Sequence, residues 1–315
     1  MTNRTPITRR ESIGKILQLT GGLALGSALP WIPENIIPAR AATPGKGFIV
    51  EGVGRTAGYS IKELIRKVFE AAGGIEKIVS RGDVVAIKPN ISWANAPKFA
   101  ATTNPEVLEA VIELCREAGA KKIRIVDHTI HDARRCFAVT GAGAVAKKTG
   151  ADLVYPRPSL MKKMKIRGSR LDVWPVFTPL VEADKLINLP IAKNHSLSVL
   201  TLGMKNWFGG VGGSRWSLHQ DINASIVDLA QFFKPTVTLI DAIRILSRNG
   251  PSGGSLSDVA AKDTLILSND PVAADGRAAM LFDRDPDTLY FIKLGQKWGL
   301  GTYEFDKLDQ KKVIL

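Results

Sequence analysis

Apolar residues beyond position 47 fall into short runs that alternate with segments of helical spacing. Apolar runs of strand length predict buried strands at residues 48–53, 84–90, 122–126, 153–155, 186–190, 236–241 and 264–267. Helices are predicted at residues 60–72, after a capping box, and at 104–119, where Pro105 follows a capping Asn104. Further helical patterns cover residues 142–149, 219–233, 273–282 and 287–298.

Alternating strands and helices favour an α/β fold with a mostly parallel sheet covered by helices on both faces, a Rossmann-like three-layer arrangement. Residues 159–180 interrupt the alternation with a basic, proline-marked stretch, which we interpret as an inserted β-hairpin. The chain has no internal repeat and no low-complexity linker. Residues 42–315 are therefore predicted to form a single α/β domain.

The N-terminus has the order basic, apolar, small that is typical of an export signal. Arg9 and Arg10 precede a moderately apolar run at residues 16–26, and Ala39-Arg40-Ala41 provides a small-x-small cleavage site before Ala42. Paired arginines indicate the twin-arginine class. Residues 1–41 are thus predicted to be a signal peptide read by the twin-arginine translocase, which gives a periplasmic protein without a stable membrane anchor after cleavage.

Composition narrows the class of function. Apolar residues make up 45% and charged residues 23% of the chain, which is ordinary for a globular protein, and the net charge is +13. A basic balance can indicate nucleic acid, anionic lipid or a small anionic ligand, and a solvated basic surface explains most of these residues equally well. The sequence contains no nucleic-acid-binding motif and export argues against nucleic acid, so the partner expected here is a small anionic ligand and not nucleic acid. Cys115 and Cys136 are the two cysteines, too few for a four-cysteine iron–sulfur cluster from this chain alone.

Polar residues collect where the predicted strands end. Ligands of open parallel sheets bind beyond the carboxyl ends of the strands, because loops and helix N-termini converge there. The residues at these positions are Lys88, Asn90, Thr102, Thr103, Asn104, Asp127, His128, Asn188, Lys193, Asn194, His195 and Asp241. Taken singly, Asn104 and Asn194 are equally well explained by helix capping and turn formation.

Two glycine-rich segments add candidate residues. Residues 201–213 include Lys205 and Asn206, and residues 249–254 begin with Asn249. Glycines allow backbone amides to approach an anion closely. Neither segment matches a phosphate-binding or dinucleotide-binding motif.

Five motifs follow one another in a fixed order. They are Ile87-Lys88-Pro89-Asn90, Thr103-Asn104-Pro105-Glu106-Val107, Leu186-Ile187-Asn188-Leu189-Pro190 with Lys193 and His195, Thr201-Leu202-Gly203-Met204-Lys205-Asn206 with Phe208-Gly209, and Asp241 before Asn249-Gly250-Pro251. In this order they resemble the domain of unknown function 362 family, over residues 48 to 285. Relatives in that family often carry a ferredoxin-like segment, which this chain lacks, so their electron-transfer role does not carry over.

Three hypotheses of function remain open. In the first, Lys88, Lys193 and Lys205 hold a small anionic substrate or cofactor and Asn90, Thr103, Asn206 and Asn249 complete its binding site, while His195 moves protons with Asp241 or Asp127. In the second, the protein is a non-catalytic binding or assembly module for a periplasmic redox complex and a redox partner protein. In the third, suggested by a likeness of layout to nickel-dependent lactate racemases, it is a metal-dependent racemase or isomerase.

The cofactor is left open by the sequence, and a metal ion is one candidate. His128 and His131, interleaved with Asp127 and Asp132, offer nitrogen and oxygen ligands within a short stretch. Polar residues on an exposed loop explain the same pattern.

Overall fold

The computed structural model describes residues 47–315, so the predicted signal peptide and its cleavage site lie outside the described residues. Described residues form a ten-stranded sheet and a separate two-stranded hairpin. Among them, no helix is long and apolar enough to cross a membrane.

The order of the strands places the predicted parallel strands at the centre of the large sheet. From one edge to the other, the sheet contains β12 (Asp309–Ile314), β1 (Phe48–Val53), β11 (Val259–Ser268), β10 (Val237–Leu246), β7 (Lys185–Leu189), β2 (Val84–Pro89), β3 (Lys122–Val126) and β4 (Asp152–Val154). β11 runs antiparallel to both of its neighbours, whereas β2, β3, β4, β7 and β10 pair in parallel. β8 (Ile191–His195) pairs in parallel with β10 and in antiparallel with β9 (Val199–Thr201).

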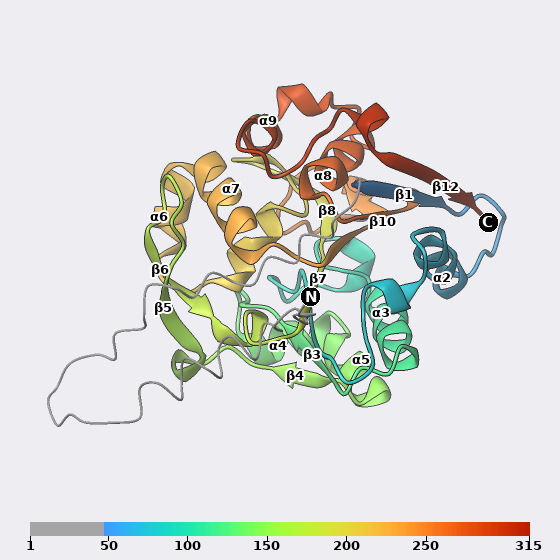
Figure 1. Ribbon diagram of the computed structural model, residues 1–315, viewed down its shortest axis with the longest axis horizontal. Coiled ribbons are helices and arrows are strands. Elements are labelled where there is room, and N and C mark those ends of the chain that lie inside the picture. The colour runs from blue at the N-terminus through green and yellow to red at the C-terminus, as the bar shows by residue number, and fades with distance from the viewer. Residues whose placement is uncertain (1–46) are drawn as a thin grey trace, which may run out of the picture.

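Helices cover both faces of this sheet, as the alternation predicts (Figure 1). α2 (Ile61–Ala71), α3 (Pro105–Glu117) and α5 (Ala142–Thr149) supply side chains to one hydrophobic cluster, together with Val85 and Ile87 of β2. α7 (Ile222–Phe233), α8 (Pro271–Met280) and α9 (Tyr290–Lys297) supply the other, together with Val84 and Ala86. Consecutive residues of β2 thus point to opposite cores, which is why this strand is apolar throughout.

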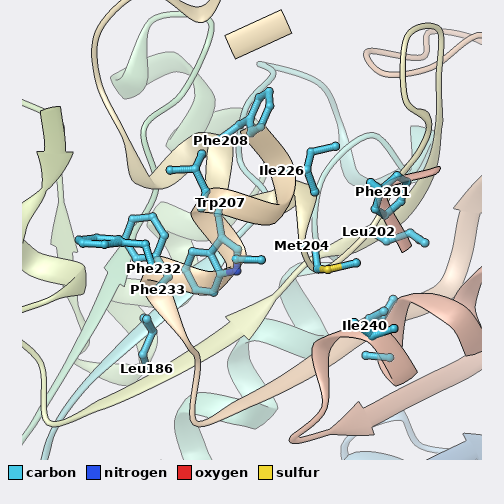
Figure 2. Close-up of a cluster of buried hydrophobic side chains, with 14 of the residues drawn as sticks. Leu186, Leu202, Met204, Trp207, Phe208, Ile226, Phe232, Phe233, Ile240 and Phe291 are labelled. Carbon is cyan, nitrogen blue, oxygen red and sulfur yellow. The ribbon is translucent and has the colours of Figure 1, made fainter. Parts of the chain in front are cut away.

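Figure 2 shows part of the second core. The Trp207 and Phe233 rings stack with their centroids 4.7 Å apart, and both side chains are fully buried. This packing holds the 3₁₀-helix Lys205–Gly210 against α7. The core therefore fixes the position of Lys205, the first residue of that 3₁₀-helix.

Several element boundaries differ from the prediction. The pattern at residues 219–233 contains two helices, α6 (Arg215–Gln220) and α7, because Asp221 accepts a hydrogen bond from the Ala224 amide and begins a new helix. β10 and β11 extend well beyond the predicted strands, since their outer halves pair with one another as an antiparallel ribbon. The sequence prediction missed α4 (Ala133–Val139), the β8–β9 pair and β12.

The inserted hairpin is present as β5 (Met161–Lys165) and β6 (Val173–Phe177). Its turn is held by Asp228 of α7, whose buried carboxylate accepts the backbone amides of Ser169, Arg170 and Leu171, each at 2.8 Å. A carboxylate that accepts several amides is a strong, charge-assisted tether.

Asp228→Ala is expected to destabilise the protein by about 3 kcal/mol or more, because it leaves amides of the hairpin turn without their acceptor. Denaturant unfolding measures the effect. Asp152→Ala is the matched control, since that carboxylate lies on the surface, 49% exposed, and pairs with Lys122. If Asp228→Ala lowers the free energy of unfolding no more than this control does, Asp228 does not hold the hairpin turn.

Candidate functional site

A buried ion pair joins the ends of two neighbouring strands. Lys88 lies near the end of β2 and Asp127 directly follows β3, and their side chains are 1% and 0% exposed. The Lys88 Nζ atom donates to Asp127 Oδ1 at 2.7 Å, to the Pro89 carbonyl at 2.8 Å and to Asn206 Oδ1 at 3.1 Å. Three acceptors use all three ammonium hydrogens, so Lys88 has no donor left for a ligand.

The remaining polar atoms around this pair are also satisfied. Asp127 Oδ2 accepts the Ile91 amide at 2.6 Å, and the Asn206 amide nitrogen donates to the Lys88 carbonyl at 3.1 Å and to Asn188 Oδ1 at 2.9 Å. A Cβ atom at Gly209 would lie 2.0 Å from Asp127 Oδ1, so only glycine fits there. The ion pair and its neighbours form a closed network.

Two backbone amides of the glycine-rich segment 201–213 are not available to a bound ligand. Gly203 and Met204 donate their backbone N–H groups to Asp275 of α8, at 2.7 and 2.9 Å. Burial raises the pKa of Asp275 to about 7. Glycines of this segment instead permit close approach, at Gly209 to the ion pair and at Gly210 to the Phe233 ring.

Two further lysines lie beside the network with fewer partners. Lys193 of β8 donates to the Ala101 carbonyl at 2.6 Å and to Asn90 Oδ1 at 3.4 Å. Lys205, 5% exposed, makes no hydrogen bond within the described part of the chain, and its Nζ atom lies 4.1 Å from the centre of the Phe208 ring.

Burial and like charges act together on these two lysines. Burial, together with the positive charges of Lys205 and Lys88, lowers the pKa of Lys193 to about 7. Burial likewise lowers the pKa of Lys205 to about 7, with the Arg215 guanidinium as the second cause. Both ammonium groups are therefore poised to lose a proton near neutral pH.

Two histidine rings beside Lys205 have opposite tautomers. His219 Nδ1 lies 2.6 Å from the Arg215 carbonyl, which can only accept, so Nδ1 carries the proton and Nε2 keeps its lone pair. His195 Nδ1 accepts the amides of Leu197 and Ser198, at 3.0 and 3.3 Å, so its proton is on Nε2. The rings stack with centroids 6.2 Å apart.

Both imidazoles are neutral at pH 7. Burial lowers the pKa of His195 to about 3, helped by Lys205 and Lys193, and burial is also the main cause of the lowered pKa of His219. His195 therefore presents a hydrogen-bond donor and His219 an acceptor. We refer to Lys193, Lys205, Arg215, His195 and His219 as the cationic cluster.

Comparison with known proteins places every residue of this cluster inside one family domain. Residues 85–280 match the family described as domain of unknown function (DUF362). The chain belongs to this family. A thylakoid-associated protein of Synechocystis sp. is 27% identical over 249 residues, which is 76% of this chain and 76% of that protein.

Two solved structures share part of the fold. The lactate racemase apoprotein from Thermoanaerobacterium thermosaccharolyticum is 13% identical with a TM-score of 0.44, and the alignment covers 75% of this chain and 57% of that one. A Thermotoga maritima protein from a structural genomics programme is 11% identical with a TM-score of 0.45, covering 71% and 59%. The chain thus spans less than two thirds of either structure.

Several residues predicted to bind a ligand in this DUF362 domain instead contact other groups of the protein. Thr103 Oγ1 accepts the Asn90 amide and donates to the Leu189 carbonyl, both at 2.8 Å. Asn249 donates to both oxygens of Asp258, each at 3.0 Å, within its own loop. These contacts use the polar atoms that the sequence interpretation gave to a ligand.

Asp241 is likewise separate from His195. Its buried carboxylate accepts the amides of Asn104, at 2.7 Å, and Ile243, at 3.2 Å, and burial raises its pKa to about 6. Within residues 47–315, no hydrogen bond joins His195 to Asp241 or Asp127. The predicted acid–base pairs of His195 are therefore not assembled.

The predicted metal ligands are directed to different partners. His128 Nδ1 donates to the Val211 carbonyl at 2.7 Å, whereas exposed His131 accepts the Ala94 amide at 3.3 Å and packs edge-on against Trp93. Across the described residues, no group of three or more His, Cys, Asp or Glu side chains is arranged to hold a metal ion. Within the part of the chain that the structure describes, His128 and His131 therefore do not belong to one shared set of ligands.

Arg215 is a member of the cluster that sequence reasoning missed. Its guanidinium donates to the carbonyls of His128 and Thr129, and burial lowers its pKa. Arg215 and His219 are four residues apart in α6 and are only partly buried, so α6 is the side of the cluster nearest to solvent. The four-residue spacing of Arg215 and His219 was the sequence signal that could have placed both side chains on one face of a helix.

Two surface depressions lie away from this cluster. One of about 280 Å³ is lined by α2 and α3, and one of about 480 Å³ lies beside the end of α8. Neither contains a residue of the cationic cluster.

The lowered pKa of Lys205 predicts a pH-dependent stability. Folded Lys205 loses its proton near pH 7, whereas the unfolded chain keeps it up to about 10.5. Between these values the unfolded state binds more protons, so stability falls as pH drops from about 10.5 toward 7 and no longer changes on account of Lys205 below that pH. Wild type should gain roughly 1 kcal/mol per pH unit over Lys205→Met between about pH 7.5 and 9.5.

Denaturant unfolding of both proteins across this range measures that gain, and the pairwise difference cancels the titration of groups that do not interact with Lys205. Lys162→Met on exposed β5 is the control and should differ from wild type by a constant amount. A constant difference for Lys205→Met as well contradicts the lowered pKa.

Proposed function

We propose that this protein acts outside the cytoplasm by binding a small carboxylate or phosphate anion at the cationic cluster. The observation that carries the proposal is Lys205, a buried ammonium without a hydrogen-bond acceptor beside two other cations, Lys193 and Arg215. Buried charges in proteins are ordinarily paired. An anion supplies the missing partner.

The charge balance of the site supports this ligand. Lys88, Lys193 and Arg215 lie near one carboxylate, Asp127, which is already paired with Lys88, and Lys205 lies near both Lys193 and Arg215. An anion between the other three cations would exchange their repulsion for charge-assisted hydrogen bonds. His195 Nε2–H adds a neutral donor on the same side.

This proposal divides the candidate residues into two groups. Lys88, Asn90, Asp127 and Asn206 hold the strand ends in place, since their polar atoms are used by one another. Lys205, Arg215 and His195 keep donor capacity and contact the anion. Lys193 contributes charge and its third ammonium hydrogen.

A suitable anion is expected to raise the melting temperature. Thermal unfolding with phosphate, pyruvate, lactate or succinate should show a stabilisation of about 2.7 kcal/mol at a hundredfold excess over the dissociation constant. Lys205→Met should lose the shift and remain folded by near-UV circular dichroism, whereas Lys162→Met should keep it. If no anion stabilises wild type, or if the two variants lose the shift equally, the proposal fails and a binding or assembly module is favoured.

Export by the twin-arginine route is part of the same proposal, and its support is Arg9-Arg10 before the apolar run and Ala39-Arg40-Ala41. Replacing Arg9 and Arg10 with lysine keeps the charge but removes the guanidinium pair that the translocase reads. Precursor should then accumulate in the cytoplasm, as fractionation and immunoblotting would reveal. Normal periplasmic levels of the double-lysine variant contradict the assignment.

A further inference from the structure

From the geometry of the cationic cluster we infer that Lys205 is a nucleophilic amine, which forms an imine with the carbonyl group of a bound 2-oxo carboxylate. This inference rests on the proposed anion site and names its substrate class. It concerns the Lys205 nitrogen, the neighbouring Phe208 ring and the His219 imidazole.

The three lysines of the site differ in what their ammonium groups contact. Lys88 donates to three acceptors and Lys193 to two. Lys205 makes no hydrogen bond within residues 47–315 and lies against the face of Phe208, with Nζ 4.1 Å from the ring centre. A lysine that only had to neutralise charge would be paired as Lys88 is, whereas a nucleophile needs a free nitrogen.

The surroundings of Lys205 also favour its neutral form. Burial and the neighbouring Arg215 guanidinium lower the pKa of Lys205 to about 7. Desolvation and a nearby cation are the two means by which proteins activate a lysine as a nucleophile. A large fraction of Lys205 is then an amine at neutral pH.

His219 is placed to receive the proton that Lys205 gives up. Its ring meets the Phe208 ring edge-on, with centroids 5.4 Å apart, so Lys205 and His219 flank the same aromatic side chain. The Nδ1–H group is fixed on the Arg215 carbonyl, which leaves the Nε2 lone pair as proton acceptor. His195, stacked on His219, offers Nε2–H to the carbonyl oxygen.

These groups define the substrate as a carbonyl compound with an adjacent carboxylate. The carboxylate binds Arg215 and Lys193, and the Lys205 nitrogen attacks the carbonyl carbon. The C–N bond forms as the C=O π bond breaks, and His219 takes one proton from nitrogen and delivers it to the alkoxide oxygen, which gives a carbinolamine. The nitrogen then loses its second proton through His219 to the hydroxyl group, the C–O bond breaks as the C=N bond forms, and water leaves with both protons, so amine and carbonyl become imine and water without any change of oxidation state.

The test is reductive trapping with pyruvate as the probe. Full-length mature protein is incubated with pyruvate and sodium borohydride, and the products are analysed by intact mass and peptide mapping. One reduced adduct per chain, located on Lys205, is expected. Lys205→Arg, which keeps the positive charge, should give none, and Lys162→Met should behave as wild type.

His219→Gln separates proton transfer from binding. It should slow trapping by about a hundredfold, as expected for loss of a general base, while the thermal shift with pyruvate persists. Adducts spread over surface lysines, or equal trapping of Lys205→Arg, would overturn the imine. Stabilisation by pyruvate without any adduct also overturns the imine but leaves the anion site intact, whereas absence of both results overturns the anion site itself.

Discussion

The buried ion pair between Lys88 and Asp127 is the constraint on which the rest of the site depends. A charge removed from water is tolerated only when it is paired and all of its hydrogen-bonding capacity is used. Here that requirement gathers three segments of chain, since β2 supplies Lys88, the end of β3 supplies Asp127, and the Lys205–Gly210 turn supplies Asn206. Satisfying one ammonium group therefore sets the distance between two strand ends and a loop.

That constraint also explains the glycines, and through them the position of Lys205. The turn approaches so closely that Gly209 has no room for a side chain beside Asp127, and Asp275 holds the other end of the turn by two amides. With both ends fixed and Trp207 stacked on Phe233, Lys205 has little freedom to move toward an acceptor or into water. The packing around Lys205 thus leaves its ammonium group without a hydrogen-bond acceptor among the described residues.

Much of the fold could be predicted from the sequence, because buried parallel strands are apolar on both faces and so stand out as continuous runs. The sequence prediction missed β12 because this strand lies at the sheet edge and is mostly polar. It missed the β8–β9 pair because both strands are short and β8 carries the polar residues Lys193 and His195. The expectation that polar residues at the carboxyl ends of parallel strands lie together is met by Lys88, Asp127 and Lys193. It could not tell which of them are used by one another, because that depends on distances of a few tenths of an ångström. The helix predicted at residues 219–233 began at His219, so Arg215, at the start of α6, lay outside the predicted element.

The two histidines show how backbone groups determine what chemistry a site can do. A carbonyl at His219 and two amides at His195 assign opposite tautomers to adjacent rings, so one faces the cluster as acceptor and the other as donor. Burial keeps both neutral at pH 7, and neither ring hydrogen-bonds to a carboxylate among the described residues. A histidine paired with aspartate would gain basicity and draw positive charge into the site, adding to the repulsion among Lys193, Lys205 and Arg215. Neutral rings held by backbone groups avoid this, which leaves the positive charge of the cluster to the lysines and arginine and leaves proton movement to a ring that starts uncharged.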